Sequence, residues 1–524
     1  MKIAIRADAS TEIGTGHIMR CLTLANALRE TGAEIFFLCR PHAGNIVDLV
    51  CDQGYQVFCL EYPSQESDNL LLHSNWLGST QKQDAQQCVQ YLKDNIVDWI
   101  VVDHYSLDET WELELQPYCR NLMVIDDLSD RRHICDIILD QNFGSTKKKY
   151  QHLVPESSYI LAGSDFTLLR PEFAEWRQYS LKRRQLPKID SLLINLGGVD
   201  ADNITAQLIL QLEFCDLPEK TSVTVVLGAT APHFAEVERV ANDSKYSVTV
   251  IVAASNMAQI MSNSDLAIGA AGSTTWERCC LGLPTILVAI ADNQQLVASS
   301  LAQVGAAQVI NQVSELPDQI NSAKVNLVKL STSSIQISDG QGALRVSRFI
   351  TESYFGVQKH SLIPYTALTQ EQSMFVLEMR NHQEIRQWMH NKCLISKSEH
   401  LLFIKGLIFC KDKRFFLVQR GDKILGAINF TDINLKSQKA QFGIFANPFL
   451  DEKGRGKTLT TLALQYATKT LNLTNLDLVV IPDNKLAINL YKKFGFIQVR
   501  ESVENNQTYL NMTKVIVKGF NNEN

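Results

Sequence analysis

The chain opens with Lys2-Ile3-Ala4-Ile5-Arg6-Ala7-Asp8, reaches Gly14-Thr15-Gly16-His17 and continues with Ile18-Met19-Arg20-Cys21-Leu22-Thr23-Leu24-Ala25. An apolar run, a glycine-rich turn and a helical pattern predict a strand that feeds a helix at 17–30. Free backbone N–H groups at a helix start favour an anion such as a diphosphate. His17 adds a side chain that can exchange protons near neutral pH. The stretch therefore predicts an α/β domain with chemistry beside a phosphate ester.

The composition is that of an ordinary globular protein, with 45% hydrophobic and 20% charged residues among 524. This length predicts about two to four domains. The net charge of −6 provides no general attraction to nucleic acid or to an anionic membrane. Arg6 and Asp8 interrupt the apolar start, so no signal peptide is expected, and no run reaches the roughly 18 apolar residues of a membrane span. The twelve cysteines contain no CxxC pair, which favours reduced thiols in a cytoplasmic protein over a disulfide frame or a zinc site.

The chain up to residue 330 alternates short apolar runs with amphipathic stretches. Strands are expected at 3–6, 34–39, 99–102, 122–125, 191–195, 223–227, 248–251, 266–268 and 285–287, with helices between most of them, as at 275–281. Such alternation predicts parallel sheets covered on both faces. The pattern restarts near Ser191, after a polar and basic stretch. We therefore expect two doubly wound, Rossmann-like domains at 1–180 and 181–355, with a ligand cleft between them.

The texture changes after residue 330, and we expect a linker at 356–364 and a third, α+β domain at 365–516. Its expected elements are a helix at 370–390, a hairpin of strands 414–419 and 423–431, a strand at 438–446, a glycine-rich turn at 453–457, a helix at 458–471, a strand at 476–481 and a helix at 485–494.

The first glycine-rich turn is open to several interpretations when taken alone. Gly14 and Gly16 could simply permit a tight strand–helix connection. The dinucleotide fingerprint fits poorly, because a third glycine at the required offset is missing and His17 takes the next place. His17 could also be a hydrogen-bonded structural cap. Its position at the positive end of a helix favours a neutral ring that can accept a proton, whereas a bound phosphate favours the charged ring.

A second stretch of small residues, Gly269-Ala270-Ala271-Gly272-Ser273-Thr274-Thr275-Trp276-Glu277, follows the expected strand 266–268. Small residues permit close backbone approach, and the hydroxyls of Ser273 and Thr274 can donate to phosphate oxygens. Glu277 lies one helical turn in, where a carboxylate can accept two hydrogen bonds from a ribose diol. The alternative is a plain helix cap followed by an ordinary first-turn acid.

Several separated motifs together resemble one family. They are Gly14–His17 with Met19-Arg20-Cys21, Asp103-His104-Tyr105, Asp126-Asp127, Cys135-Asp136 through Asp140-Gln141-Asn142, Leu168–Phe173, Gly197-Gly198-Val199-Asp200 with Asn203, and Gly272–Glu277 with Asp292-Asn293-Gln294. This pattern is similar to the UDP-sugar hydrolases of pseudaminic acid synthesis. That family is itself similar to the two-domain GT-B glycosyltransferase that adds N-acetylglucosamine to the peptidoglycan lipid precursor. The resemblance covers about residues 1–350.

The resemblance implies a GT-B arrangement and hydrolysis of UDP-2,4-diacetamido-2,4,6-trideoxy-β-L-altropyranose at its anomeric C–O bond, with His17 as the catalytic base and no metal. It implies a substrate-binding set of Gly14, Thr15, Gly16, Arg170, Gly197, Gly198, Gly272, Ser273, Thr274, Glu277, Asn293 and Gln294. Within it, Glu277 holds the ribose and Gly272–Thr274 the phosphates. Asp103-His104 and Asp126-Asp127 are candidates for substrate contacts, although Asp126-Asp127 could equally be a turn that caps neighbouring N–H groups.

A second anion-binding pattern, Lys453-Gly454-Arg455-Gly456-Lys457, lies between a strand and a helix of the third domain. Alone it could be a solvated basic turn. The later Asn484, Asn489, Tyr491 and Gly495-Phe496 make the segment 365–515 resemble the GNAT acetyltransferases. One departure is Asp451, which stands where that family usually has Gln or Arg.

The GNAT resemblance implies acetyl-CoA as cosubstrate. The basic loop Lys453, Gly454, Arg455, Gly456 and Lys457 would hold the pyrophosphate, and the backbone around Phe445–Asn447, with Asn484 and Asn489, would hold the pantetheine arm. Tyr491 would be the general acid for the departing thiolate, because a phenol and a thiolate have similar basicity. The alternative for Tyr491 is a core aromatic whose hydroxyl points to water. No sequence feature identifies the base that accepts the amine proton.

Together the patterns predict a bifunctional enzyme of pseudaminic acid synthesis. The third domain would acetylate the 4-amino group of UDP-4-amino-4,6-dideoxy-N-acetyl-β-L-altrosamine, and the first two would hydrolyse the product. Three alternatives stay open: a GT-B glycosyltransferase with a sugar or lipid acceptor, a hydrolase for another diacetamido UDP-sugar isomer, and a sugar-nucleotide-binding sensor. Only Asp451 favours the sensor. The sequence does not predict the oligomeric state.

Overall fold

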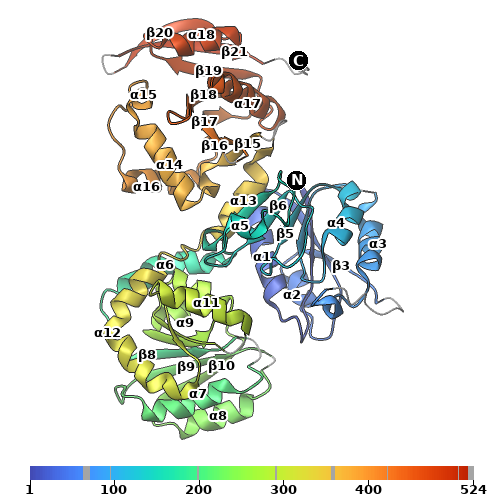
Figure 1. Cartoon of the computed structure of the whole chain (residues 1–524), viewed down its shortest axis with the longest axis vertical. Helices are drawn as coiled ribbons and strands as arrows, with labels where there is room; N and C mark the ends of the chain where they lie inside the picture. The colour runs from blue at the N-terminus through green and yellow to red at the C-terminus, as the bar shows by residue number, and fades with distance from the viewer. Residues whose placement is uncertain are drawn as a thin grey trace. The chain divides into compact units, whose positions relative to one another are not determined.

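The computed structural model describes residues 1–62, 71–94, 96–197, 200–229, 231–289, 292–355, 360–421, 423–504 and 507–516, with the backbone alone at 292–294 and 354–355. The chain divides into two compact units, Met1–Leu344 and Arg345–Asn524. The first unit contains two parallel sheets, and the second contains one mixed sheet (Figure 1).

The first sheet has seven parallel strands in the order β3-β2-β1-β4-β5-β6-β7. They are β1 Lys2–Ala7, β2 Glu34–Cys39, β3 Gln56–Cys59, β4 Val97–Asp103, β5 Cys119–Ile125, β6 Ile137–Asp140 and β7 Tyr159–Ala162. The helices are α1 Gly16–Arg29, α2 Val47–Asp52, α3 Gln81–Leu92, α4 Glu109–Leu115 and α5 Lys147–Tyr150, with the short 3₁₀ helix η1 Ser74–Leu77. The strand order reverses between β1 and β4, and ligands of such sheets usually bind at this switch point, beyond the carboxyl ends of the strands.

Burial explains why the apolar runs form central strands. Ile3, Ala4 and Ile5 of β1 are completely buried, as parallel strands covered on both faces require. Helices α3 and α4 cover one face, where Cys88, Leu92 and Trp111 share a core with residues of β1, β2 and β4.

The second sheet has six parallel strands in the order β10-β9-β8-β11-β12-β13. They are β8 Ser191–Asn195, β9 Ser222–Leu227, β10 Ser247–Val252, β11 Leu266–Ala270, β12 Thr285–Val288 and β13 Gln308–Ile310. The helices are α6 Pro171–Arg183, α7 Ile204–Gln211, α8 Phe234–Asp243, α9 Met257–Asn263, α10 Thr274–Cys280, α11 Asp292–Gln303 and α12 Leu316–Ser334. One face packs on α7, α8 and α12, and the other on α6, α9, α10 and α11 (Figure 1).

The second unit contains an eight-stranded sheet in the order β14-β15-β16-β17-β18-β19-β21-β20. Its strands are β14 Tyr354–Phe355, β15 His360–Pro364, β16 Arg414–Arg420, β17 Lys423–Asn434, β18 Lys439–Ala446, β19 Asn475–Val480, β20 Ile497–Glu504 and β21 Gln507–Val515. Its helices are α14 Gln370–Asn381, α15 Gln383–Arg386, α16 Lys397–Leu407, α17 Arg455–Lys469 and α18 Lys485–Lys493, and α13 Gly342–Glu352 spans the junction of the two units.

Strands β18 and β19 part soon after they meet. They pair in parallel at only three positions, Lys439↔Asn475, Ala440↔Leu476 and Gln441↔Asp477. Both strands continue beyond these pairs, and on its other side β18 stays paired with β17 as far as Ala446. The last residues of β18 therefore make strand-pairing hydrogen bonds on one side only. The backbone N–H and C=O groups on the other side could pair with an extended ligand.

The three sheets agree with the expected fold class of two doubly wound domains and an α+β domain. All nine strands expected in the first unit are present, together with the expected hairpin, in which Arg420 pairs with Lys423. The short strands β3, β6, β7 and β13 were not expected, nor were β14, β15, β20, β21 and helix α16. The helix expected at 370–390 is shorter, because α14 ends at Asn381 and α15 follows as a separate turn.

Two expected boundaries differ from the structure. The division expected after residue 180 falls inside α6, and this helix already belongs with the second sheet because its Phe173 packs in a core with Leu193 of β8. The expected linker 356–364 contains strand β15, which pairs with β16 and is buried throughout. A five-residue strand carries too little periodicity to be distinguished from a linker by sequence.

Gly269 of β11 provides a test of how tightly the second sheet is packed. A Cβ there would lie 2.8 Å from the carbonyl oxygen of Asn195 and would collide with the buried Arg278 guanidinium. We expect Gly269→Ala to destabilise the protein by about 1–3 kcal/mol, the usual cost of overpacking a close-packed core. A Cβ at Gly272 would meet nothing within 4 Å, so Gly272→Ala should leave the melting temperature unchanged. If scanning calorimetry gave Gly269→Ala the same melting temperature as the parent protein, this description of the packing would be wrong.

Candidate functional site

His17 lies at the start of α1, next to the end of strand β4. Its Nδ1 is 2.6 Å from Oδ1 of Asp103, the last residue of β4, and the His17 side chain is 9% exposed. The carboxylate accepts, so the Nδ1 atom of His17 carries the proton and Nε2 carries the lone pair of the neutral ring. The described residues place no hydrogen-bond partner on Nε2. His17 can therefore accept a proton at Nε2.

Arg20, one turn further along α1, keeps Asp103 ionised. Its Nε and Nη2 atoms donate to the two carboxylate oxygens of Asp103 at 2.6 and 2.7 Å. Burial raises the pKa of Asp103, but the Arg20 guanidinium and His17 outweigh it and hold that pKa well below its ordinary value. A charged Asp103 both fixes the tautomer of His17 and stabilises the imidazolium that a proton transfer would create.

Tyr105 and Asp127 extend this network. The Tyr105 hydroxyl donates to Asp127 Oδ2 at 2.7 Å, and Asn142 donates to Oδ1 at 3.1 Å. The ring of Tyr105 meets that of His17 edge-on, with centroids 4.6 Å apart. Burial, with the Asp127 charge, raises the pKa of Tyr105, so the phenol stays protonated. Asp127 is thus hydrogen-bonded to other side chains. Its neighbour Asp126 instead accepts from the backbone N–H of Ser129, as expected for a turn.

Sequence reasoning proposed Asp103 only as a substrate contact and missed the roles of Arg20, Tyr105 and Asp127. Asp103 is completely buried, and its carboxylate is hydrogen-bonded to His17 and Arg20 rather than available to a substrate. The sequence did contain a signal for this pairing. Asp103 is the last residue of β4, a doubly wound strand order places β4 beside β1, and the helix that follows β1 carries His17.

In the second sheet, Glu277 and Arg170 come together. Glu277 lies in the first turn of α10, and its Oε1 is 3.6 Å from Nη2 of Arg170, which also pairs with Glu172 at 3.1 Å. Burial raises the pKa of Glu277 to about 7, and the Arg170 charge offsets only part of this effect. Both residues were expected in the substrate site. A carboxyl that titrates near neutrality will respond to any ligand that requires its charged form.

The buried Arg278 holds the loop that precedes Glu277. The guanidinium of Arg278 donates to the carbonyl oxygen of Ala270 at 2.7 Å and to the Thr274 hydroxyl at 3.2 Å. Ser273 stands at the N-cap of α10, is exposed and makes no side-chain cap bond. Gly272 is open to added atoms. The loop is therefore held by Arg278 while its outer surface stays accessible.

The remaining residues of the expected set differ in how far the structure describes them. Gly14 has a φ of +76° and Gly197 of +99°, conformations that favour glycine, and Thr15 is the N-cap of α1, which starts at Gly16. Gly198 lies outside the described residues. Asn293 and Gln294 lie in the first turn of α11, and their side chains are not described.

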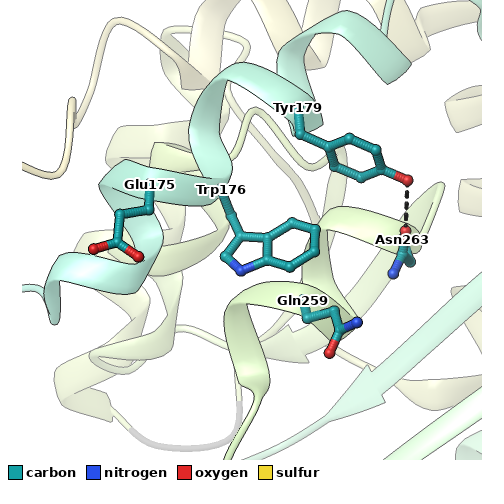
Figure 2. Close-up of a pocket in the computed structure, with 5 residues that line it drawn as sticks. All are labelled: Glu175, Trp176, Tyr179, Gln259 and Asn263. Carbon is teal, nitrogen blue, oxygen red and sulfur yellow. Dashed lines mark hydrogen bonds between the residues drawn. The ribbon is translucent and has the colours of Figure 1, made fainter.

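A cavity of about 410 Å³ lies between α6 and α9, and Figure 2 shows its lining. Glu175, Trp176, Tyr179, Gln259 and Asn263 line it, and the Tyr179 hydroxyl donates to Asn263 at 2.9 Å. Neither His17 nor Glu277 belongs to this lining. The cavity is separate from the groups with acid–base chemistry.

In the second unit, the basic loop begins α17 with Gly454 as its N-cap at a φ of +87°. Arg455 does not extend from this loop. Its Nε donates to the carbonyl oxygen of Glu452 at 2.7 Å, and its Nη1 donates to that of Asn447. Lys453, Lys457 and Asp451 are exposed, while Glu452 pairs with Arg420 at 2.9 Å. The available cations of the loop are therefore the two lysines, and Arg455 shapes it.

Tyr491 is buried on α18 between Phe442 and Phe496, with ring centroids 5.8 and 5.9 Å away. Burial raises the pKa of Tyr491 well above its ordinary value, so the phenol stays protonated. The described residues give its hydroxyl no hydrogen-bond partner. Asn484 caps α18 by accepting from the N–H of Ala487 at 3.1 Å, and Asn489 is exposed. The Asn484 side chain thus already has a structural task.

Two family models match the chain: the Glycosyltransferase family 28 C-terminal domain over residues 193–349, and the Acetyltransferase (GNAT) family over residues 381–496. The UDP-2,4-diacetamido-2,4,6-trideoxy-beta-L-altropyranose hydrolase of Campylobacter jejuni is 24% identical over 307 residues, which cover 58% of this chain and 97% of the hydrolase. The acetyltransferase PseH of the same species is 36% identical over 132 residues, which cover 25% of this chain and 81% of PseH.

Among solved structures, MurG of Acinetobacter baumannii matches 67% of this chain and 98% of its own length, with a TM-score of 0.50 and 16% identity. The chain is thus an enzyme with a GT-B-like first unit and an acetyltransferase fold in the second. Through the second unit it belongs to the GNAT acetyltransferase family, whose members take acetyl-CoA as cosubstrate.

Within the described part of the chain, no helix is long and apolar enough to cross a bilayer. The same residues include no group of three His, Cys, Asp or Glu side chains placed to hold a metal ion. All twelve cysteines are free thiols.

Proposed function

We propose that the first unit hydrolyses UDP-2,4-diacetamido-2,4,6-trideoxy-β-L-altropyranose to UDP and the free sugar. The observation that carries this proposal is the His17–Asp103 pair, which orients the imidazole through Nδ1 and leaves Nε2 as its second ring nitrogen at the switch point of the first sheet. The likeness to the Campylobacter hydrolase, over almost the whole length of that protein, supports the same substrate class.

In the proposed reaction, His17 Nε2 accepts a proton from water while the water oxygen attacks the anomeric carbon. The bond between that carbon and the diphosphate oxygen breaks, and its electron pair leaves with UDP. Because UDP is a good leaving group, the protein mainly has to position and deprotonate one water. Asp103 stabilises the imidazolium, and Arg20 keeps Asp103 charged. Arg170 and the open loop Gly272–Thr274 would hold the diphosphate, and Glu277 the ribose.

The substitution Asp103→Asn tests the role of the His17–Asp103 pair, here called the dyad. An uncharged amide cannot stabilise the imidazolium, and its NH2 group can donate to Nδ1 and favour the wrong tautomer, so we expect turnover to fall roughly 10²–10⁴-fold, as in other His–Asp pairs. UDP should still bind with nearly unchanged affinity. The matched control is Asp98→Asn, on the same strand but bonded to the N–H of Lys2 and to Arg120. Parent-like UDP release by Asp103→Asn in a coupled assay would remove the dyad from the mechanism.

The pKa of Glu277 predicts how nucleotide binding depends on pH. Burial raises this pKa to about 7, so the group gains a proton as the pH falls through 7 and then no longer accepts two hydrogen bonds from a ribose. UDP affinity should therefore rise between about pH 6 and pH 8, by at most tenfold per pH unit. Glu277→Gln should weaken binding and remove this component, whereas Glu172→Gln, which alters another carboxylate on Arg170, should retain it. Calorimetric titrations of the parent, Glu277→Gln and Glu172→Gln proteins with UDP test this prediction. Ionisation of UDP itself affects all three equally, so a difference between them reports on Glu277.

We also propose that the second unit transfers an acetyl group from acetyl-CoA to the 4-amino group of the UDP-sugar precursor. The gap between β18 and β19 supports this, because one side of the β18 backbone is available to pair with an amide-bearing pantetheine arm. Tyr491 would protonate the departing thiolate, since its phenol stays protonated in its buried position. The 36% identity to the acetyltransferase PseH supports acetyl transfer. Twelve free thiols support a reducing, cytoplasmic setting.

Tyr491→Phe tests the general acid. Loss of the hydroxyl should lower CoA release with the 4-amino UDP-sugar by roughly 10²–10⁴-fold, the usual contribution of general acid catalysis. The same protein should hydrolyse the diacetamido UDP-sugar at the parent rate, which controls for the amount of active first unit, and a parent-like melting temperature controls for folding of the second. Unchanged CoA release would reassign Tyr491 to packing against Phe442 and Phe496.

The glycosyltransferase alternative is separated by a simple observation. A hydrolase releases UDP from its substrate in water alone, whereas a transferase releases little until a sugar or lipid acceptor is added. Parent protein given the 4-amino UDP-sugar and acetyl-CoA should release CoA first and UDP second. UDP release that depends on an added acceptor would favour the transferase.

A further inference from the structure

Four rings form a continuous aromatic wall that begins at His17. Tyr105 meets the His17 ring with centroids 4.6 Å apart. Trp76 then stacks on Tyr105 at 5.9 Å, and His73 lies 5.6 Å from Tyr105 and 4.3 Å from Trp76. His73 and Trp76 are half-buried, so part of each ring remains accessible. Neither residue belongs to the sequence motifs that indicated the hydrolase.

The segment that carries these two rings is fixed to the end of β4. The Ser106 hydroxyl donates to the carbonyl oxygen of His73 at 2.5 Å, and the N–H of Trp76 donates to the same oxygen at 3.0 Å. Leu77, the last residue of η1, is 1% exposed and packs in the core that Trp111 shares. Leu77 therefore anchors the segment, and Trp76 contributes its ring to the surface beside Tyr105.

The three rings beyond His17 are also uncharged. Burial lowers the pKa of His73, with only partial opposition from the Asp130 charge, so the imidazole stays neutral at physiological pH. Tyr105 remains a neutral phenol. A neutral aromatic surface beside the base suits the apolar substituents of a sugar better than its hydroxyls.

We propose that Trp76, with His73, forms the subsite for the methyl groups of the sugar and makes the first unit selective for deoxy, acetamido-bearing UDP-sugars. This inference rests on the proposed hydrolase function, because the proposed substrate has a methyl group at C6 and an acetyl methyl on each of two amides. Tyr105 touches the His17 ring and Trp76 stacks on Tyr105, so the wall extends from the proposed base. Trp76 is thus a specificity residue and takes no part in proton transfer.

The test compares the proposed substrate with two analogues of the same configuration, one with a hydroxyl at C6 and one with a free 4-amino group. Parent protein should prefer the substrate to at least one analogue by about tenfold or more in kcat/KM, the range that an apolar pocket provides. Trp76→Ala should reduce that preference to within about threefold, by lowering kcat/KM for the substrate, while UDP, which lacks the sugar, binds unchanged.

Trp176→Ala is the matched control, since it removes another half-buried tryptophan, from the cavity between α6 and α9. Trp76→Phe should retain most of the preference, which separates loss of a ring from loss of folding. A preference that survives in Trp76→Ala would overturn the inference and leave the hydrolase intact. Absence of UDP release by the parent protein from any of the three compounds would instead contradict the proposed function.

Discussion

The carboxylate of Asp103 is the charge on which the chemistry proposed for the first unit depends. A buried carboxylate is costly unless it is paired and hydrogen-bonded. Here Arg20 occupies both oxygens, and His17 shares one of them. All three side chains lie where strand β4 and helix α1 meet, so the same interaction joins the sheet to the helix and orients the imidazole. Removing Asp103 would leave Arg20 paired with Asp127 alone and would leave the imidazole without the acceptor that orients it.

The two sheets of the first unit use the same topology for different tasks. Each reverses its strand order at one point, between β1 and β4 or between β8 and β11. At the first point the side chains are acids and a base held in a network. At the second, Gly272 leaves room beside the backbone, and Arg278 supports the loop from its buried side. The first arrangement suits proton transfer, and the second suits close approach of a nucleotide to backbone.

Much of this could be predicted from the sequence, because apolar runs fix central strands and compact motifs fix loops. The strands at 34–39 and 191–195 have the predicted bounds, and motifs suffice to propose His17, Glu277 and Tyr491 as site residues. What could not be predicted depends on contacts between distant segments. Asp103 lies 86 residues from His17, and its role follows only from the pairing of β4 with β1. Likewise, no motif indicates that Arg455 turns inward to carbonyl oxygens, so that the two neighbouring lysines are the accessible cations.

The distribution of these groups bears on why two activities would share one chain. His17, Asp103 and Glu277 lie in residues 1–344, and Tyr491 and the gap between β18 and β19 lie in the second unit. On the proposed assignments, each unit supplies its own reacting groups from its described residues, and neither proposed reaction requires a fixed orientation of the other unit. The benefit of the covalent link is then concentration. On the proposed functions, an intermediate released by one unit would meet the other at an effective concentration set by the connecting chain, without any enclosed passage.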